Sequence, residues 1–218
     1  MEKYYTRLAA AWARGKLMER LASSPLFEKP LQDLTLPEQE ELIQMGYQAG
    51  MTPYFLQKQP LSPAMLGLFQ VLRALQADHL LDVSAQEVEP GFVWPLIDAF
   101  PYLPLTVVEV KNRWTPRLKA LNHGGIQQLD TKETAAEAMT CFWSNQFDVT
   151  TSAYGMDHVS APEKLMSELL RIAKRYVLLI VSQERWSVEE LRQMGAAHAL
   201  LQFKITPEGD SYLIVARK

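Results

Sequence analysis

The chain has 218 residues, and its 48% hydrophobic and 22% charged residues give an ordinary globular balance, enough for one large domain with an extension. The net charge of −3 gives no general attraction for nucleic acid or an anionic membrane, although a local basic patch is compatible with it. Cys141 is the only cysteine, so an intramolecular disulfide is excluded, and no metal-ligand spacing occurs. No apolar run approaches the ~20 residues that cross a bilayer. We therefore expect a soluble cytoplasmic protein with no metal, nucleic-acid or membrane partner.

Residues 1–75 predict a helical extension, because apolar residues recur there at helical spacing. Thr35 with Glu38 three residues later has the capping-box pattern of a helix start. Ser62 followed by Pro63 has the residue types preferred at an N-cap and at the first helical position. This extension is expected to pack on a second region, residues 76–218.

From Leu80 onward, short apolar runs alternate with amphipathic helical segments. Near-continuous apolar strands separated by helices are typical of a parallel sheet that is covered on both faces. Near the end, "HALLQFKIT" and "SYLIVARK" are joined by "PEGD", which is too short for a helical crossover. The predicted fold is therefore α/β and Rossmann-like, a mostly parallel sheet with a C-terminal antiparallel hairpin.

Three stretches resemble the class I S-adenosylmethionine-dependent methyltransferases, particularly the small "type 11" kind. "LLDVS" (80–84) resembles their first strand, and "LTVVEV" (105–110) resembles their second strand with its terminal acidic residue. "FDVTTSAYGMDHVSAPEKLMSELLRIAKRYVLLIVS" (147–182) resembles their fourth strand, the helix after it and the fifth strand. The resemblance implies a seven-stranded sheet, S-adenosyl-L-methionine as cofactor and methyl transfer to a small molecule.

The resemblance also implies which residues bind the cofactor, at the carboxyl ends of the strands. Glu109 corresponds to the acidic residue that binds the ribose hydroxyls, and Asp82 to the one that helps hold the amino acid portion. For Asp82 a structural role is equally open, since a carboxylate there can accept N–H bonds from the next turn. Asp130 and Thr131 correspond to the pair that contacts adenine, although Asp-Thr is also a common helix cap.

The loop after the first strand departs from the family pattern. Its first residues, Ser84 and Ala85, are small and leave room for the cofactor, but its only glycine is Gly91. Glycines normally let the backbone approach the cofactor there. Glu87 and Glu89 add negative charge, which attracts the ammonium or sulfonium of the cofactor but repels its carboxylate.

Ser152, Tyr154 and His158 follow the fourth strand, where the family places groups that face the cofactor and the methyl acceptor. We predict a cofactor contact for Ser152, while Tyr154 and His158 are the candidate catalytic residues. A histidine side chain can serve as a general base near neutral pH, although His158 fits a structural role at the strand end slightly better. Tyr154 fits a pocket wall better than a catalytic role. Aromatic residues of the extension either form a lid over the acceptor or pack as core: Tyr4, Tyr5, Trp12, Tyr54 and Phe55.

Two functions from different classes follow from these observations. The first is a methyltransferase that acts on a small molecule. The second is a catalytically silent, methyltransferase-like binding or interaction module, which the missing glycines favour. A nicotinamide-dependent oxidoreductase is disfavoured because no G-x-G-x-x-G follows the first strand.

Overall fold

The computed structural model describes residues 24–26, 34–35, 37–38, 41, 45, 61–84, 92–100, 103–109 and 129–218. The chain divides into two compact units, Met1–Gln59 with Thr115–Gln127 and Pro60–Trp114 with Gln128–Lys218. In the first unit, the Glu38 carboxylate accepts hydrogen bonds from the N–H and the hydroxyl of Thr35, both at 2.7 Å. The predicted capping pair is therefore in contact. The lid aromatics lie outside the described residues, and the predicted domain boundary near residue 75 stays a prediction.

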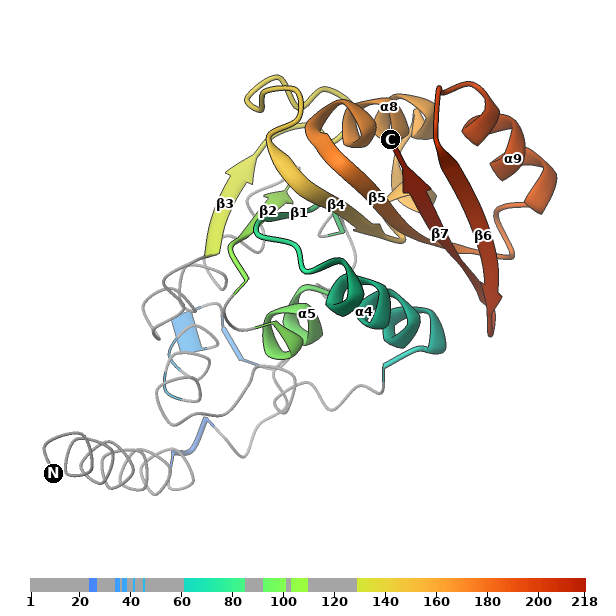
Figure 1. Cartoon of the computed structure of the whole chain (residues 1–218). Helices are drawn as coiled ribbons and strands as arrows, with labels where there is room; N and C mark the ends of the chain where they lie inside the picture. Colours follow the sequence, from blue (N-terminus) through green and yellow to red (C-terminus); the bar gives the residue numbers. More distant parts are fainter. Residues whose placement is uncertain are drawn as a thin grey trace, which may run out of the picture. The chain divides into compact units, whose positions relative to one another are not determined.

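The second unit is built on a seven-stranded sheet (Figure 1). Its strands are β1 (Leu80–Asp82), β2 (Leu105–Glu109), β3 (Leu129–Glu133), β4 (Phe147–Ala153), β5 (Ala173–Ser182), β6 (Gln202–Glu208) and β7 (Ser211–Arg217). The order is β3-β2-β1-β4-β5-β7-β6, in which β1 to β5 are parallel and β7 is antiparallel to both β5 and β6. The predicted α/β fold, with its C-terminal antiparallel hairpin, is confirmed.

The described helices of this unit are α4 (Pro63–Leu75), α5 (Val93–Ala99), α7 (Gly155–His158), α8 (Pro162–Ile172) and α9 (Val188–Ala196). The predicted start of α4 is confirmed, because the Ser62 side chain accepts a hydrogen bond from the Met65 N–H at 3.2 Å and Pro63 is the first helical residue. Ser187 and Glu190 form a reciprocal capping box at the start of α9. Within the described segments, every helix is too short or too polar to traverse a bilayer.

Strand β5 shows why the sheet needs apolar residues on both faces. Val177, Leu179 and Val181 belong to the core cluster that includes residues of α8. Leu178 and Ile180 are equally buried and alternate with them, so they point to the other face, where α4 contacts β5, β6 and β7. Figure 1 shows α4 and α8 on opposite sides of the sheet. The continuous apolar run of β5 is therefore explained by two-sided burial.

Candidate functional site

The carboxyl ends of the parallel strands meet at one edge, where the sequence predicted the site. Asp82, the last residue of β1, pairs with Val107 of β2 and with Thr151 of β4. β2 continues to Glu109 and β4 to Ala153, so each neighbour runs two residues beyond β1 (109 − 107 and 153 − 151). β2 and β3 lie on one side of β1, while β4 and β5 lie on the other. The end of β1 is therefore the switch point at which open α/β sheets bind ligands.

Asp82 is completely buried at this switch point. Its Oδ2 accepts the Ser84 N–H at 3.2 Å, and its Oδ1 accepts the hydroxyls of Ser84 and Thr151, each at 2.7 Å. Burial raises the pKa of Asp82 to about 6, and the hydrogen bonds from Ser84 and Thr151 oppose that rise. The carboxylate therefore joins the end of β1 to the end of β4.

Ser84 extends this connection by one more hydrogen bond. Its hydroxyl donates to Asp82 and accepts the Ala153 N–H at 2.6 Å. We call Asp82, Ser84, Thr151 and Ala153 the Asp82 network. The structural role predicted for Asp82, as acceptor for the following turn, is confirmed by the Ser84 N–H. The cofactor contacts of Asp82 and Ser84 stay predictions, and Ala85 lies outside the described residues.

Ser152 is buried beside this network, and its hydroxyl donates to the backbone carbonyl of Val83 at 3.1 Å. Gly155, the first residue of α7, packs against the same two groups. A Cβ on Gly155 would lie 2.6 Å from the Val83 carbonyl oxygen and closer still to the Ser152 hydroxyl. Sequence reasoning did not single out Gly155, although a glycine directly after a predicted strand end is a signal of close backbone approach.

β3 requires a correction to the predicted site. Asp130 and Thr131 were expected at the carboxyl end of the third strand, but they lie near the start of β3 (Leu129–Glu133). Asp130 pairs with Thr106, its carboxylate accepts the Thr131 N–H at 2.9 Å, and it forms an exposed ion pair with Lys132 at 3.3 Å. The strand is polar because it is the edge strand, so apolar runs do not mark its bounds.

The acidic residue at the carboxyl end of β3 is Glu133, which sequence reasoning missed. It is exposed, and its backbone pairs with that of Glu109, the last residue of β2. The predicted position of Glu109 at the tip of the second strand is therefore confirmed, while its ribose contact stays a prediction. Two glutamates thus stand next to each other at the carboxyl edge.

Tyr154 adopts a left-handed backbone conformation, with φ 60° and ψ 1°, directly after β4. Its N–H donates to the Ile180 carbonyl at 2.7 Å, and its hydroxyl lies 3.0 Å from the Ser211 hydroxyl at the start of β7. Because β7 lies on the side of β4 away from β1, the phenol is directed away from the switch point. The structure therefore places Tyr154 as a link between strands, and its catalytic role stays a prediction.

Asp157 and His158 have different environments within α7. The buried Asp157 carboxylate accepts the Trp186 indole N–H at 2.7 Å and the Ser182 N–H at 3.0 Å. Burial raises the pKa of Asp157, against the lowering by these two hydrogen bonds. His158 is exposed. Asp157 therefore fixes the segment after β4 to the segment after β5, and His158 is left accessible at the carboxyl edge.

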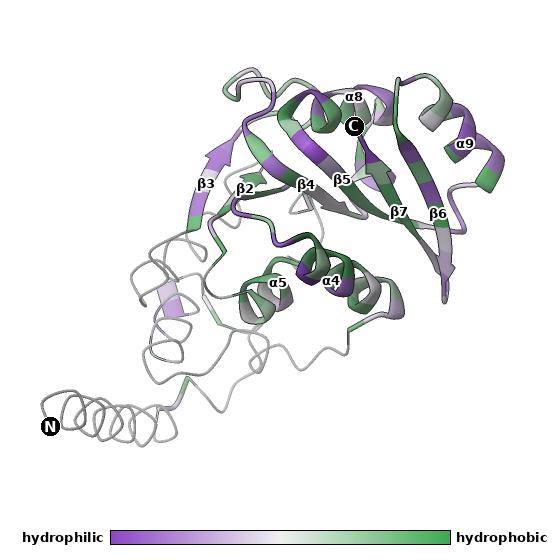
Figure 2. Ribbon diagram, viewed as in Figure 1, coloured by the Kyte–Doolittle hydropathy of each residue, from purple (hydrophilic) through white to green (hydrophobic). Residues whose placement is uncertain are grey.

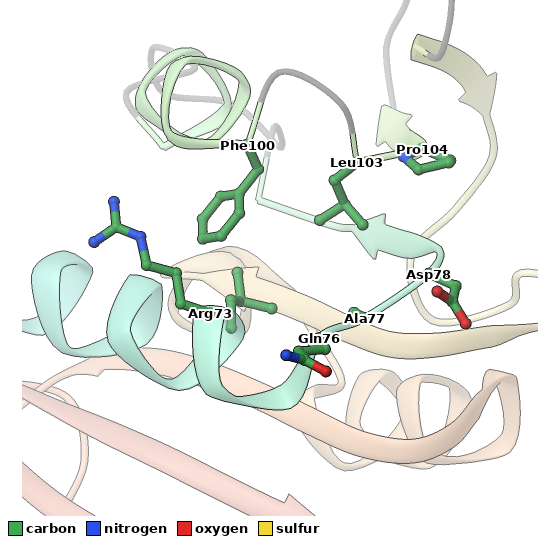
Figure 3. Close-up of a pocket in the computed structure, with 8 residues that line it drawn as sticks. Arg73, Gln76, Ala77, Asp78, Phe100, Leu103 and Pro104 are labelled. Carbon is green, nitrogen blue, oxygen red and sulfur yellow. The ribbon is translucent and has the colours of Figure 1, made fainter.

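A pocket of about 430 Å³ lies at the opposite, amino edge of the sheet (Figure 3). It is lined by the end of α4 and by the segments that lead into β1 and β2: Leu72, Arg73, Gln76, Ala77, Asp78, Phe100, Leu103 and Pro104. The guanidinium of Arg73 lies 5.7 Å from the centre of the Phe100 ring. The predicted site residues do not line this pocket, which is separate from the switch point.

Comparison with solved structures identifies the fold. A SAM-dependent methyltransferase from Thermotoga maritima aligns with a TM-score of 0.53 and 16% identity, over 72% of this chain and 90% of that one. PigF with SAH aligns with a TM-score of 0.53 and 14% identity, over 72% of this chain and 54% of that one. The [4+2]-cyclase SpnF aligns with a TM-score of 0.54 and 13% identity, over 69% and 80% of the two chains. No protein-family model matches the sequence, and no curated protein matches it significantly.

The chain therefore has the class I fold of S-adenosylmethionine-dependent methyltransferases. The predicted resemblance is confirmed at the level of the fold. At 13–16% sequence identity, these structural similarities do not assign a function to any residue of this chain. Because SpnF is a cyclase on the same fold, the fold alone does not fix the reaction.

Proposed function

We propose that the chain binds S-adenosyl-L-methionine at the carboxyl edge beside β1 and transfers its methyl group to a small molecule. The position of Glu109 carries this proposal, because it stands two residues beyond the end of β1, at the switch point of a methyltransferase fold. A carboxylate there suits ribose, since it accepts hydrogen bonds from two neighbouring hydroxyls. PigF, which has the same fold, has been solved with SAH.

The residues at this edge suit the charge of the cofactor. The nucleoside bears a sulfonium and an ammonium group, and Glu109 and Glu133 supply negative charge next to each other. In this proposal Glu109 binds the ribose and Glu133, in place of Asp130, is the acidic group nearest the adenine. Asp82 acts through its network, by holding the end of β1 against β4.

Bound cofactor supplies an electrophilic methyl group, so the chain itself has to orient the acceptor and keep it close. In-line alignment and proximity account for most of such a transfer. His158, exposed at the edge, is the described residue best placed to take a proton from an acceptor. Asp157 supports it from α7, because its two hydrogen bonds fix that helix to the segment after β5.

A second function is favoured by a specific observation. The Asp82 carboxylate is completely buried and already accepts three hydrogen bonds, so little of it is left for a ligand. Together with a first loop that has one glycine, this supports a catalytically silent binding module. In that case the hydrogen bonds of the Asp82 network occupy the carboxyl edge, and the cofactor does not bind there.

Calorimetric titration of the full chain with S-adenosylmethionine, S-adenosylhomocysteine and NAD separates these functions. We expect binding of the first two ligands and none of NAD. Glu109→Ala removes charge-assisted hydrogen bonds worth ~1.5–3 kcal/mol each, so affinity should fall at least about tenfold. Glu184→Ala is the matched control, because it removes the same type of side chain at an exposed position that follows β5.

A flat titration of the folded parent protein would instead support the silent module. Equal affinity of the Glu109→Ala variant and the parent would contradict the assignment of Glu109 while leaving cofactor binding intact. Circular dichroism of each variant shows whether the fold is retained.

A further inference from the structure

Two large apolar side chains are exposed at the amino edge of the sheet. Trp143 is 81% exposed and Leu201 is 75% exposed. Trp143 lies shortly before β4 and Leu201 directly before β6, and these two strands start at the same edge because β6 and β4 run parallel. β5 and β7 lie between β4 and β6, so three strand spacings of ~4.8 Å separate the starts of β4 and β6 by about 14 Å.

Cationic side chains lie on β5 and β7, the two strands between β4 and β6. Arg175 of β5 and Arg217 of β7 both place a guanidinium 6.0 Å from the centre of the Tyr176 ring. Tyr176 pairs with Arg217 across the two strands. The ammonium of Lys218 donates to the Asn145 side chain at 2.7 Å and to the Ala173 carbonyl at 2.8 Å. Figure 2 shows the hydrophilic start of β5 beside the hydrophilic end of β7.

Two of the acidic residues nearby already have partners of their own. Asp148 pairs with Lys174 at 3.3 Å, and Glu168 pairs with Arg171 at 2.7 Å. Within the described part of the chain, no carboxylate forms an ion pair with Arg175, Arg217 or Lys218. Asp148 acts electrostatically on Arg175, and the Arg175 guanidinium donates to the Leu75 carbonyl at 3.2 Å, so the local charge is offset only in part. Arg175 and Arg217 remain exposed cations on a chain whose net charge is −3.

The exposed groups are held rigidly on this edge. The Arg171 guanidinium donates to the carbonyls of Phe142 at 2.9 Å and Met139 at 3.0 Å, which fixes the segment that carries Trp143. The Leu201 N–H donates to the Arg217 carbonyl at 2.9 Å, so Leu201 is fixed to the end of β7. We call Trp143, Arg175, Tyr176, Leu201, Arg217 and Lys218 the amino-edge patch.

We propose that the amino-edge patch docks reversibly on an anionic lipid surface. The patch needs no complementary pocket, because its two apolar groups flank a cationic band along one edge of a rigid sheet. Tryptophan is favoured where an apolar layer meets water, and Arg and Lys are attracted to anionic headgroups. Apolar insertion together with a basic patch supplies the two signals that peripheral attachment requires. The proposal is independent of cofactor binding, which belongs to the opposite edge.

The charge of the patch sets the size of the effect. Each cation near an anionic surface strengthens binding about fivefold, so the two exposed arginines, Arg175 and Arg217, give a factor of about 25. Raised salt should weaken binding, because the Debye length falls to ~3 Å at 1 M salt.

Co-sedimentation of the full chain with vesicles tests the proposal. The two probes are phosphatidylcholine vesicles and vesicles of phosphatidylcholine mixed with phosphatidylserine. We expect stronger partitioning to the mixed vesicles, and Arg175→Gln with Arg217→Gln should lower it about 25-fold. Arg185→Gln with Arg192→Gln is the matched control, because both arginines are exposed away from the patch and the net charge changes equally.

The apolar part of the patch is tested separately. Trp143→Ala should lower partitioning to the mixed vesicles several-fold, whereas Leu66→Ala, at a residue 48% exposed on α4, should not. Neither change removes a buried side chain, so melting temperatures should stay the same.

Three results would overturn the proposal. The first is equal partitioning to neutral and mixed vesicles, and the second is equal loss in the patch variants and their controls. The third is tighter binding to an oligothymidine strand than to mixed vesicles, with loss in the arginine variants, which would make the patch a nucleic-acid site. The patch variants should retain the parent's result in the cofactor titration, whichever result that is.

Discussion

Replacing Asp82 by Asn should change how the stability of the protein depends on pH. In the unfolded chain Asp82 titrates near 3.8, and in the fold its pKa rises to about 6 because burial disfavours the charged form. The folded state therefore binds this proton more tightly. Its contribution to stability is fully present below the unfolded pKa and is lost as the pH rises through the folded pKa.

The size of this change follows from the difference between the two pKa values. A rise from 3.8 to about 6 is worth about 3 kcal/mol at ~1.4 kcal/mol per unit. The Asn side chain does not titrate and fills nearly the same volume. Its NH2 group cannot accept the Ser84 N–H, and the cost of that lost hydrogen bond does not depend on pH. The unfolding free energy of the parent minus that of Asp82→Asn should therefore fall by about 2.4 kcal/mol between pH 4 and pH 7, and by about 3 kcal/mol from a pH well below 3.8 to pH 7.

Urea unfolding at a series of pH values measures this difference. Subtracting the variant removes the titrations that both proteins share. Thr151→Val removes one hydrogen bond that lowers the pKa of Asp82, so in that background the midpoint of the difference should move to higher pH. A difference that stays constant within about 1 kcal/mol, or that rises with pH, would refute the reasoning.

Two further substitutions test the packing around α7. Gly155→Ala should lower the unfolding free energy by ~1–3 kcal/mol, because the added Cβ would lie 2.6 Å from the Val83 carbonyl oxygen. An unfolding free energy in urea equal to that of the parent would show that α7 can shift. Trp186→Phe should lower the unfolding free energy by ~1–3 kcal/mol in the same assay, since it removes a hydrogen-bond donor from the buried Asp157 carboxylate. The same change should raise the Asp157 pKa further. A Trp186→Phe variant as stable as the parent would show that water replaces the indole.

The parts of the fold that were predicted correctly are those in which burial dictates the residue types. β5 reads as an apolar run because α4 and α8 cover both of its faces. The β6–β7 hairpin was predicted from "PEGD", and Gly209 in its turn has a φ of +66°, which favours glycine. In both places a local pattern was sufficient.

The failures occur where tertiary contacts decide the structure. The third strand was predicted to end near Asp130, but β3 extends to Glu133. An edge strand with mostly exposed residues has no apolar run to mark its bounds. The direction of Tyr154 was equally hidden, since its partner Ser211 lies 57 residues further along the chain. The Asp82 network joins residues that are 69 positions apart in the sequence. The sequence of either strand alone therefore could not predict that the Asp82 carboxylate has hydrogen-bond partners on both strands.

The short β1 strand also bears on synthesis. It is an interior strand of the sheet, yet the hydrogen bond between Asp82 and Thr151 joins residues that are 69 positions apart. At ~5–20 residues per second, a ribosome takes roughly 3–14 s to synthesise the chain from Asp82 to Thr151. During this time the Asp82 carboxylate is exposed to water and ionised. The β4, β5, β6 and β7 strands pair among themselves and are made last. We expect this late-made half to form first, with β1 joining it as a following step that includes uptake of a proton near pH 6.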